Sequence, residues 1–419
     1  SGLATMPFAW LFFELVVWVV VPSLRPARPE ARVVIPALAL AMALLRVEGP
    51  LWVGFVLALG GAAAAWRDGR LDRDVSRTWL APGLAVIAIY GIYTAWRIHH
   101  FGTWVPNTAL VKVGFDHWVA LRGLKYLAVF LITTIVPVAG IVAGAQLQGD
   151  RRLAPLLFVV VVVFGYAVLV GGDFMPFGRL LMPAVPFVGL LIGAAVWPRL
   201  GMGLVALGAL PLLGIHPVPS SLLRPLHFRH SDVDFMSELD RWANQRDNCV
   251  GFVRRGRALA AIAEPGDAVV AGAVGAIGYA SDLEVLDQHG LVTKEVAYRP
   301  VPDGPLRTSP GHDKHVPPSF FVKYAPRFLY ARTVSGPLAG GRMKDTLVQW
   351  RVPSAVQDRY VPDFWEVTEP DDAERTFLLV VRRRTDDEDP ALVWNGFAGR
   401  RRSLNAELRD ARVSQGISP

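Results

Sequence analysis

Long apolar runs alternate with short charged segments over the first half of the chain, and this pattern ends near residue 215. A membrane-spanning helix needs about 20 apolar residues, with a lower limit of about 17. The runs that approach this length are 7–24, 33–48, 50–66, 80–96, 121–147, 153–170, 180–197 and 201–215. The pattern predicts a polytopic α-helical membrane domain of about eight crossings over residues 1–215.

The pair of runs within 33–66 allows two interpretations. It forms either two crossings or one tilted helix followed by a re-entrant piece. The break between the runs, Arg46-Val47-Glu48-Gly49-Pro50, is a poor mid-membrane sequence because it combines two charges with a proline. We therefore favour two crossings.

The second half has the composition of an α/β domain, predicted over 216–395, and ends in a polar tail, 396–419. Residues 231–245 have the apolar spacing of a helix, with Ser231 at the cap position. Further segments read as strand, small-residue helix and strand at 267–290, and as strands at 327–334 and 376–384.

Charge along the first half predicts a topology. Arg-rich connections alternate with connections that carry fewer cations, and the positive-inside rule assigns the Arg-rich set to the cytoplasm. The opposite face then collects the N-terminal residues, Arg46–Glu48, the 97–120 loop, 171–179 and the C-terminal half. This predicts a multi-pass protein of the cytoplasmic membrane with an extracytoplasmic C-terminal domain.

The formal net charge of +7 does not by itself indicate nucleic acid. The cations are spread over short connections and the tail, without a basic stripe interleaved with aromatic residues. We therefore expect no nucleic-acid partner. The single Cys249 cannot form an internal disulfide, so cysteine usage says nothing about compartment.

The segment GGDFMPFGR (171–179) places a carboxylate and a guanidinium between two apolar runs. Glycines permit tight turns there, and Pro176 interrupts a helix. Either Asp173 and Arg179 simply pair, or they line a pocket. In a pocket, Arg179 would clamp a phosphate and Asp173 would orient a hydroxyl.

The segment WRIHHFGTWVPNTALVK (96–112) gathers five more candidates: Arg97, His99, His100, Asn107 and Lys112. It is either an interfacial aromatic belt with a solvated loop, or an anion site built on Arg97 and Lys112. Adjacent histidines point apart and have no third ligand nearby, so we predict no metal.

Two further motifs have similarly open interpretations. His312, in GHDKH (311–315), lies either in a solvated turn or over a pocket. GAVGAIG (272–278) has the spacing GxxGxxG rather than GxGxxG, which favours a close-packed helix over a dinucleotide loop. We predict no cofactor.

Four segments together resemble a known family: SGLATMPF, LLRVEGPLW, WRIHHFGTWVPNTALVK and VGGDFMPFGRLLMPAVP. They are similar in order and spacing to the polyprenyl-phosphate-dependent membrane glycosyltransferases of the GT-C fold. The branch is that of the terminal arabinofuranosyltransferases of actinobacterial cell walls. AIGYASDLEVLDQHGLV and GHDK resemble that branch's C-terminal domain, so the similarity covers about residues 1–330. Ala4 and Val47 depart from the family's usual Glu and Pro.

The resemblance implies transfer of a sugar, such as arabinofuranose or another pentose or hexose, from a polyprenyl-phosphate donor to a cell-envelope glycan, by a monomer in the bilayer. It implies donor-phosphate binding by Arg97, Lys112 and Arg179. Pocket residues would be Arg46, Glu48, His99, His100, Asn107 and His312. It also implies that the family's first helices and acidic loop lie upstream of Ser1, leaving Asp173 as the candidate base in this chain.

Two other function classes remain open from the sequence. A carrier or flippase-like transporter of a lipid-linked or anionic substrate would place its polar groups near the middle of its helices. A membrane-anchored binding module would use the C-terminal half, but that half shows no obvious aromatic platform for sugars in its sequence.

Overall fold

The computed structural model describes residues 2–20, 30–68, 73–112, 116–134, 154–194, 238–306, 309–335, 339–367 and 375–395. The chain forms two compact units. Unit 1 comprises Ser1–Trp242 and Val301–Asp313, and unit 2 comprises Ala243–Pro300 and Lys314–Pro419. The domain boundary predicted at 215/216 and the polar tail 396–419 lie outside the described residues.

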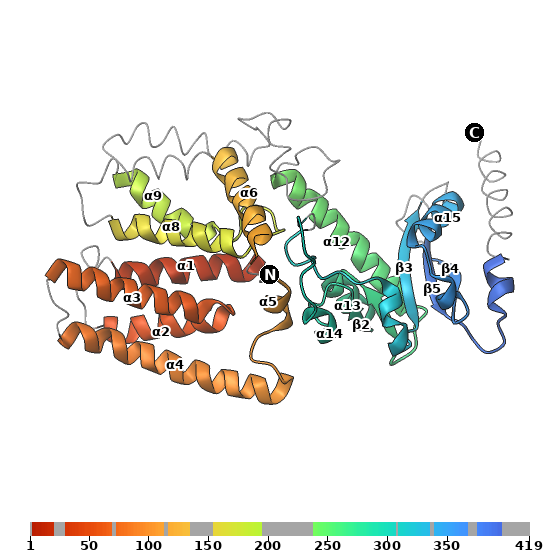
Figure 1. Cartoon of the computed structure of the whole chain (residues 1–419), viewed down its shortest axis with the longest axis horizontal. Coiled ribbons are helices and arrows are strands. Elements are labelled where there is room, and N and C mark those ends of the chain that lie inside the picture. Colours follow the sequence, from red (N-terminus) through yellow and green to blue (C-terminus); the bar gives the residue numbers. More distant parts are fainter. Residues whose placement is uncertain are drawn as a thin grey trace. The chain divides into compact units, whose positions relative to one another are not determined.

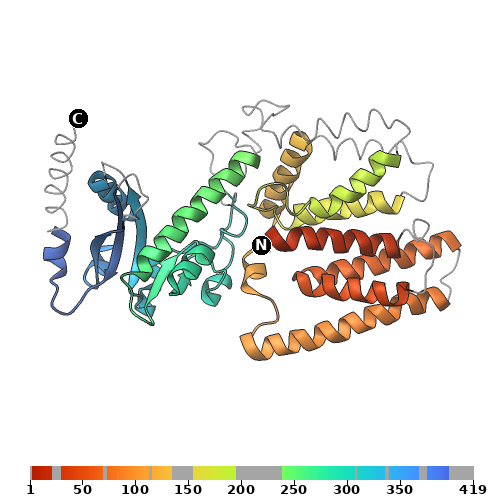
Figure 2. The ribbon, with the colours of Figure 1, turned by 180° about the vertical axis from the view of Figure 1, so that it is seen from behind.

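Unit 1 is helical, and its long helices alternate in direction (Figures 1 and 2). Its elements are α1 (Gly2–Val19), α2 (Ala31–Leu45), α3 (Gly49–Asp68), α4 (Arg73–Phe101), α5 (Asn107–Lys112), α6 (His117–Thr134), α8 (Ala154–Leu169), η2 (Met182–Ala184) and α9 (Val185–Ala194). Every predicted apolar run except 201–215, which lies outside the described set, overlaps one of these helices. Residues 33–66 form two helices, α2 and α3, but the prediction that both are membrane crossings is wrong.

The membrane interpretation of these helices is wrong. Within the part of the chain that the structure describes, no helix is both long enough and apolar enough to span a bilayer. Helix α2, for example, has 15 residues, against the roughly 20 that a crossing requires. The predicted polytopic fold of about eight crossings, the multi-pass location in the cytoplasmic membrane and the extracytoplasmic placement of the C-terminal domain are corrected accordingly.

The core of unit 1 is built around α1 and is rich in aromatic contacts. The ring of Phe12 lies 5.2 Å from Trp52 and 5.7 Å from Phe187, both edge to face. Trp52 in turn meets Tyr166 of α8 at 5.2 Å. Such pairs add about 0.5–1.5 kcal/mol to the free energy already gained from burial of the rings. Residues far apart in the sequence are thereby fixed in one core.

Helices α6 and α8 approach each other closely at Gly123. A Cβ atom at this position would lie 2.2 Å from the carbonyl oxygen of Val168. Only glycine permits this backbone approach, because the neighbour is main chain and cannot rotate away. The contact brings the start of α6 against the end of α8, where the GGDFMPFGR segment begins.

Unit 2 contains a five-stranded sheet in the order β2-β1-β3-β5-β4. Its strands are β1 (Ala268–Ala271), β2 (Glu284–Asp287), β3 (Phe328–Ser335), β4 (Tyr360–Glu366) and β5 (Thr376–Arg383). Strand β1 pairs in parallel with β2 and β3, and β5 pairs antiparallel with β3 and β4. The other elements are α12 (Glu238–Ala260), which starts in unit 1, α13 (Val274–Ser281), α14 (Lys294–Ala297), η5 (Pro318–Tyr324), α15 (Ala339–Trp350) and α16 (Ser354–Gln357).

Four of the five strands lie where the sequence predicts them. The GAVGAIG segment leads from β1 into α13, as expected for a packed helix. Gly256 and Gly278 provide close contacts around this helix: a Cβ at Gly256 would lie 2.7 Å from Ala280 Cβ. Strand β4 was not predicted from the sequence.

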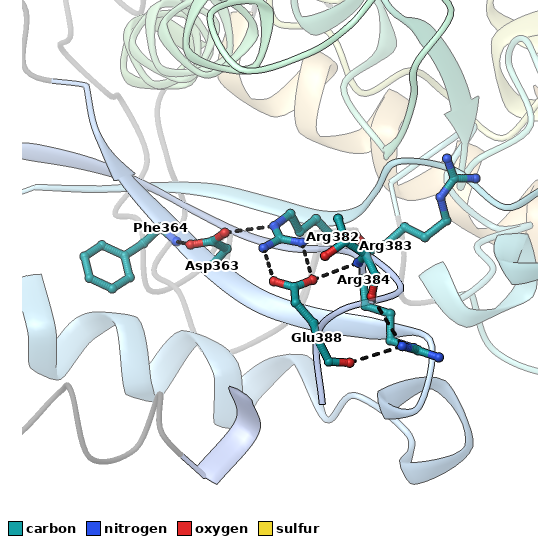
Figure 3. Close-up of polar contacts among 7 residues, drawn as sticks. Asp363, Phe364, Arg382, Arg383, Arg384 and Glu388 are labelled. Atoms are coloured by element: carbon teal, nitrogen blue, oxygen red, sulfur yellow. Dashed lines mark hydrogen bonds and ion pairs between the residues drawn. The ribbon is translucent and has the colours of Figure 1, made fainter. Parts of the chain in front are cut away.

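The end of β5 is tied to β4 and to the following turn through Arg382 (Figure 3). Its Nε donates to Asp363 at 2.8 Å, and its Nη1 and Nη2 donate to the two oxygens of Glu388 at 2.9 and 2.6 Å. The Arg382 guanidinium lowers the pKa of Glu388 to about 2. This clamp holds the segment after β5 against the sheet.

Replacing Glu388 by Gln is expected to lower the free energy of unfolding by about 2 kcal/mol at neutral pH, the scale of a charge-assisted hydrogen bond. Because the folded-state pKa of Glu388 lies below the unfolded value of 4.5, its stabilisation is complete above pH 4.5 and disappears as the pH falls toward 2. Denaturant titrations of the wild type and E388Q at several pH values test this. The difference between them should shrink over that window, and a constant difference would contradict the assignment.

Candidate functional site

The turns and helix ends at one end of unit 1 carry most of the residues singled out from the sequence. Helices α1, α3 and α6 begin at this end, whereas α2, α4 and α8 finish there (Figures 1 and 2). The segments 46–48, 97–107 and 171–179 therefore lie at the same end of unit 1 although they are far apart in sequence.

The GGDFMPFGR segment lies along one face of α6. Gly171, Gly172 and Gly178 all have positive φ angles, of 78°, 78° and 58°. A Cβ at these three positions would come within 2.7 Å of Val119, 2.7 Å of Tyr126 and 2.6 Å of Phe130. The glycines therefore supply both the left-handed backbone and the space for a close approach to α6.

Asp173 and Arg179 form a bidentate ion pair within this segment. Arg179 donates from Nε to Asp173 Oδ2 at 2.5 Å and from Nη2 to Oδ1 at 2.9 Å. The backbone N–H of Phe174 also donates to Asp173 Oδ1 at 3.0 Å. Of the two interpretations of this segment, the pairing is thus observed, and the carboxylate of Asp173 is only 4% exposed. This geometry favours a positioning role for Asp173 over that of a proton acceptor.

A second buried ion pair, which the sequence analysis missed, flanks the first. Arg122 of α6 donates from Nη1 and Nη2 to the two oxygens of Asp313 at 2.7 and 3.0 Å, and from Nε to the carbonyl of Gly171 at 3.2 Å. Both side chains are at most 4% exposed. The two partners are 191 positions apart, so no local pattern could have revealed the pair.

The backbone of residue 174 links this arrangement to two more side chains. Arg241 donates to the carbonyl of Phe174 at 2.8 Å, and the ring of His312 meets the Phe174 ring edge to face at 5.3 Å. His312, predicted as a pocket residue, is therefore packed next to the 171–179 segment. Arg241 was not predicted.

Arg46 and Glu48, in the turn between α2 and α3, form the third ion pair of this end. Their Nε and Oε1 atoms are 2.6 Å apart, and the Arg46 guanidinium lies 5.3 Å from the centre of the Phe8 ring. Both charged side chains are 18% exposed, so this carboxylate is more accessible than that of Asp173.

The charged side chains of this turn contribute to the pKa values of two tyrosines. Burial raises the pKa of Tyr166, and the Glu48 carboxylate raises it further, while Arg46 opposes the rise and Asp173 adds to it. Burial is also the main cause that raises the pKa of Tyr90, with smaller contributions from Tyr93 and Glu48 against Arg97. The charge of Glu48 thus contributes to the raised pKa of both tyrosines, and the charge of Asp173 contributes to that of Tyr166.

The 96–112 candidates take a different local structure from the loop that was expected. Helix α4 continues to Phe101, so Arg97, His99 and His100 belong to its last turns, and Gly102 with φ of 67° ends it. The Nε of Arg97 is buried without a hydrogen-bond partner, and its guanidinium lies 5.5 Å from the Phe101 ring. His99 and His100 are exposed.

Asn107 and Lys112 are the first and last residues of the short helix α5. The side chain of Asn107 is partly buried, whereas that of Lys112 lies outside the described atoms. The anion site predicted from Arg97 and Lys112 therefore stays a prediction.

Comparisons with known proteins add one match. A family described as a domain of unknown function, DUF8728, matches residues 240–385, which contain all five strands of unit 2. No curated protein and no solved structure matches the chain. Within the described residues, no group of three or more His, Cys, Asp or Glu side chains gathers as a metal site.

Proposed function

We propose that the protein is a glycosyltransferase that moves a sugar from a polyprenyl-phosphate donor to a cell-envelope glycan. One observation carries this proposal. The segments on which the family resemblance depends lie at the end of unit 1 where α1, α3 and α6 begin and α2, α4 and α8 finish, and this end carries the Arg46–Glu48 and Asp173–Arg179 ion pairs. A carrier is expected to have its polar groups midway along the helices, so this arrangement favours transfer over transport.

The reaction requires a group that accepts a proton. The acceptor hydroxyl attacks the anomeric carbon, its oxygen forms the new glycosidic bond, and the polyprenyl phosphate leaves with the electrons of the broken carbon–oxygen bond. A base takes the proton of the hydroxyl, and cations balance the charge on the leaving phosphate. Among the described residues of unit 1, we assign the base to Glu48 rather than to Asp173.

Accessibility is the reason for this assignment. Asp173 uses both carboxylate oxygens to hold Arg179 and the Phe174 backbone and is only 4% exposed. Glu48 is 18% exposed and lies beside Arg46, which is a cation suited to a phosphate. Asp173 then positions Arg179, and Arg46 joins Arg97, Lys112 and Arg179 as a candidate for donor binding.

Replacing Glu48 by Gln is expected to lower the turnover rate about 100-fold, within the range for loss of a general base, while donor affinity stays within a factor of about three. The measurement uses the full chain with a farnesyl-phosphate pentose donor and an arabinan oligosaccharide acceptor, and follows release of farnesyl phosphate and formation of the glycoside. The matched control is Glu284→Gln, at an exposed carboxylate of β2, which should leave the rate unchanged.

The experiment tests sugar transfer and the assignment of the base separately. If the wild-type chain forms no glycoside from this donor, sugar transfer from a polyprenyl phosphate is wrong for this protein. If the wild type transfers sugar and Glu48→Gln keeps the full rate with an unchanged pH profile, only the assignment of the base is wrong.

A further inference from the structure

An exposed surface of unit 2 combines aromatic rings with cations drawn from two separate elements. Helix α14 and the turn after it contribute Lys294, Tyr298 and Arg299, and η5 contributes Phe320, Lys323 and Tyr324. We call these six residues the α14–η5 surface. The two groups of residues are separated by about two dozen positions in the sequence. Only the fold brings their aromatic rings together, so this surface was not visible in the sequence.

Cations and rings lie against each other across this surface. Lys323 Nζ is 4.4 Å from the centre of the Phe320 ring and 5.1 Å from that of Tyr324. Arg299 lies 5.5 Å from the Phe320 ring, and Lys294 lies 5.9 Å from the Tyr298 ring. Cation–π contacts at exposed sites hold long side chains in place at low cost, so the charged groups are already oriented before a ligand arrives.

One carboxylate is built into the same surface. Glu295 accepts hydrogen bonds from Lys323 Nζ and from the hydroxyl of Tyr324. The surface has three cations, Lys294, Arg299 and Lys323, against this one carboxylate, so it keeps a positive excess. Tyr298 and Tyr324 remain 56% and 48% exposed, which is high for rings of this size.

We propose that the α14–η5 surface binds an acidic polysaccharide whose uronic acids alternate with neutral sugars. The cations bind the carboxylates of such a chain, and the exposed tyrosine rings lie against the apolar faces of its sugar rings. Glu295 accepts hydrogen bonds from hydroxyl groups of a neutral sugar between two acidic ones. This inference does not depend on sugar transfer by unit 1.

The position of Glu295 favours a glycan over the other polyanions. A nucleic acid or a membrane of anionic lipids brings phosphates at closely spaced intervals, and some of these would face the Glu295 carboxylate. An alternating glycan has its charges further apart and offers neutral hydroxyl groups between them.

Binding is tested with the full chain and a fluorescein-labelled hyaluronan oligosaccharide, measured by fluorescence anisotropy. Arg299→Gln and Lys323→Gln are each expected to weaken binding about 10-fold, as for loss of one charge-assisted hydrogen bond, and Tyr298→Ala by a similar factor. The matched control is Arg375→Gln. Arg375 is also an exposed cation over a ring, 5.3 Å from Phe377, and also pairs with a carboxylate, Glu366, but it directly precedes β5 and its partner ends β4.

Parallel titrations with labelled oligo-dT, with vesicles containing phosphatidylserine and with uncharged dextran distinguish the sources of charge. Tightest binding to hyaluronan, lost in the three variants and kept in Arg375→Gln, supports the proposal. Tighter binding of oligo-dT or vesicles, equal binding of dextran, absence of hyaluronan binding, or an equal loss in the Arg375→Gln control each overturns it. Since all the substituted side chains are exposed, circular dichroism should be unchanged throughout.

Discussion

Replacing Asp313 by Ala is expected to lower the stability of unit 1 by about 3–5 kcal/mol, the effect measured when one member of a buried ion pair is removed. The variant leaves the Arg122 guanidinium, which is 3% exposed, without the carboxylate that accepts two of its hydrogen bonds. Hydrogen exchange read by mass spectrometry is the suitable measurement, because a chain of two units need not unfold in one step. Protection should fall in α6 and in residues 171–174.

Two further variants make this expectation specific. Arg375→Gln breaks the exposed pair with Glu366 and should change stability by less than about 1 kcal/mol. The double replacement of Arg122 by Met and Asp313 by Leu should recover most of the lost stability, because two apolar side chains leave no buried charge. If Asp313→Ala were as mild as Arg375→Gln, the buried pair would not organise this end of unit 1.

Replacing Gly123 by Ala is expected to destabilise unit 1 by about 3 kcal/mol or more, at the upper end of the range for overpacking. The new Cβ would meet the Val168 carbonyl oxygen at 2.2 Å, so α6 and α8 would have to move apart. Denaturant titration and hydrogen exchange of α8 measure the loss.

In the control variant, the expected change in stability has the opposite sign. Gly165 lies in α8, and a Cβ there would have nothing within 4 Å. Gly165→Ala should therefore be neutral or stabilising by up to about 1 kcal/mol, because alanine has the better helix propensity. Equal effects of the two alanines would show that helix propensity, rather than the close approach of α6 to α8, decides the stability of this region.

The hydrophobic pattern was sufficient to locate helices but not to say what surrounds them. The runs around residues 40, 57 and 160 became α2, α3 and α8, since a long apolar run favours a helix in any apolar environment. The same run length cannot distinguish a lipid-facing helix from one packed against neighbours. That ambiguity led to the incorrect membrane assignment.

The distance between two residues along the sequence also determines whether their contact could be predicted. Asp173 and Arg179 are six positions apart, and their pairing was one of two stated interpretations. The Arg122–Asp313 pair depends on tertiary structure alone. Strand β4 was missed because Pro362 lowers the strand propensity of its segment, yet β4 is the last strand in the sheet, where a proline is tolerated.

Unit 1 is discontinuous along the chain, and this limits how it can be produced as a recombinant fragment. Residues Val301–Asp313 belong to it although the stretches on both sides belong to unit 2. A fragment that stops at Trp242 lacks Asp313, the carboxylate that accepts two hydrogen bonds from Arg122. Supplying residues 301–313 as a separate peptide, or by a short graft after Trp242, would restore the missing carboxylate without the sheet.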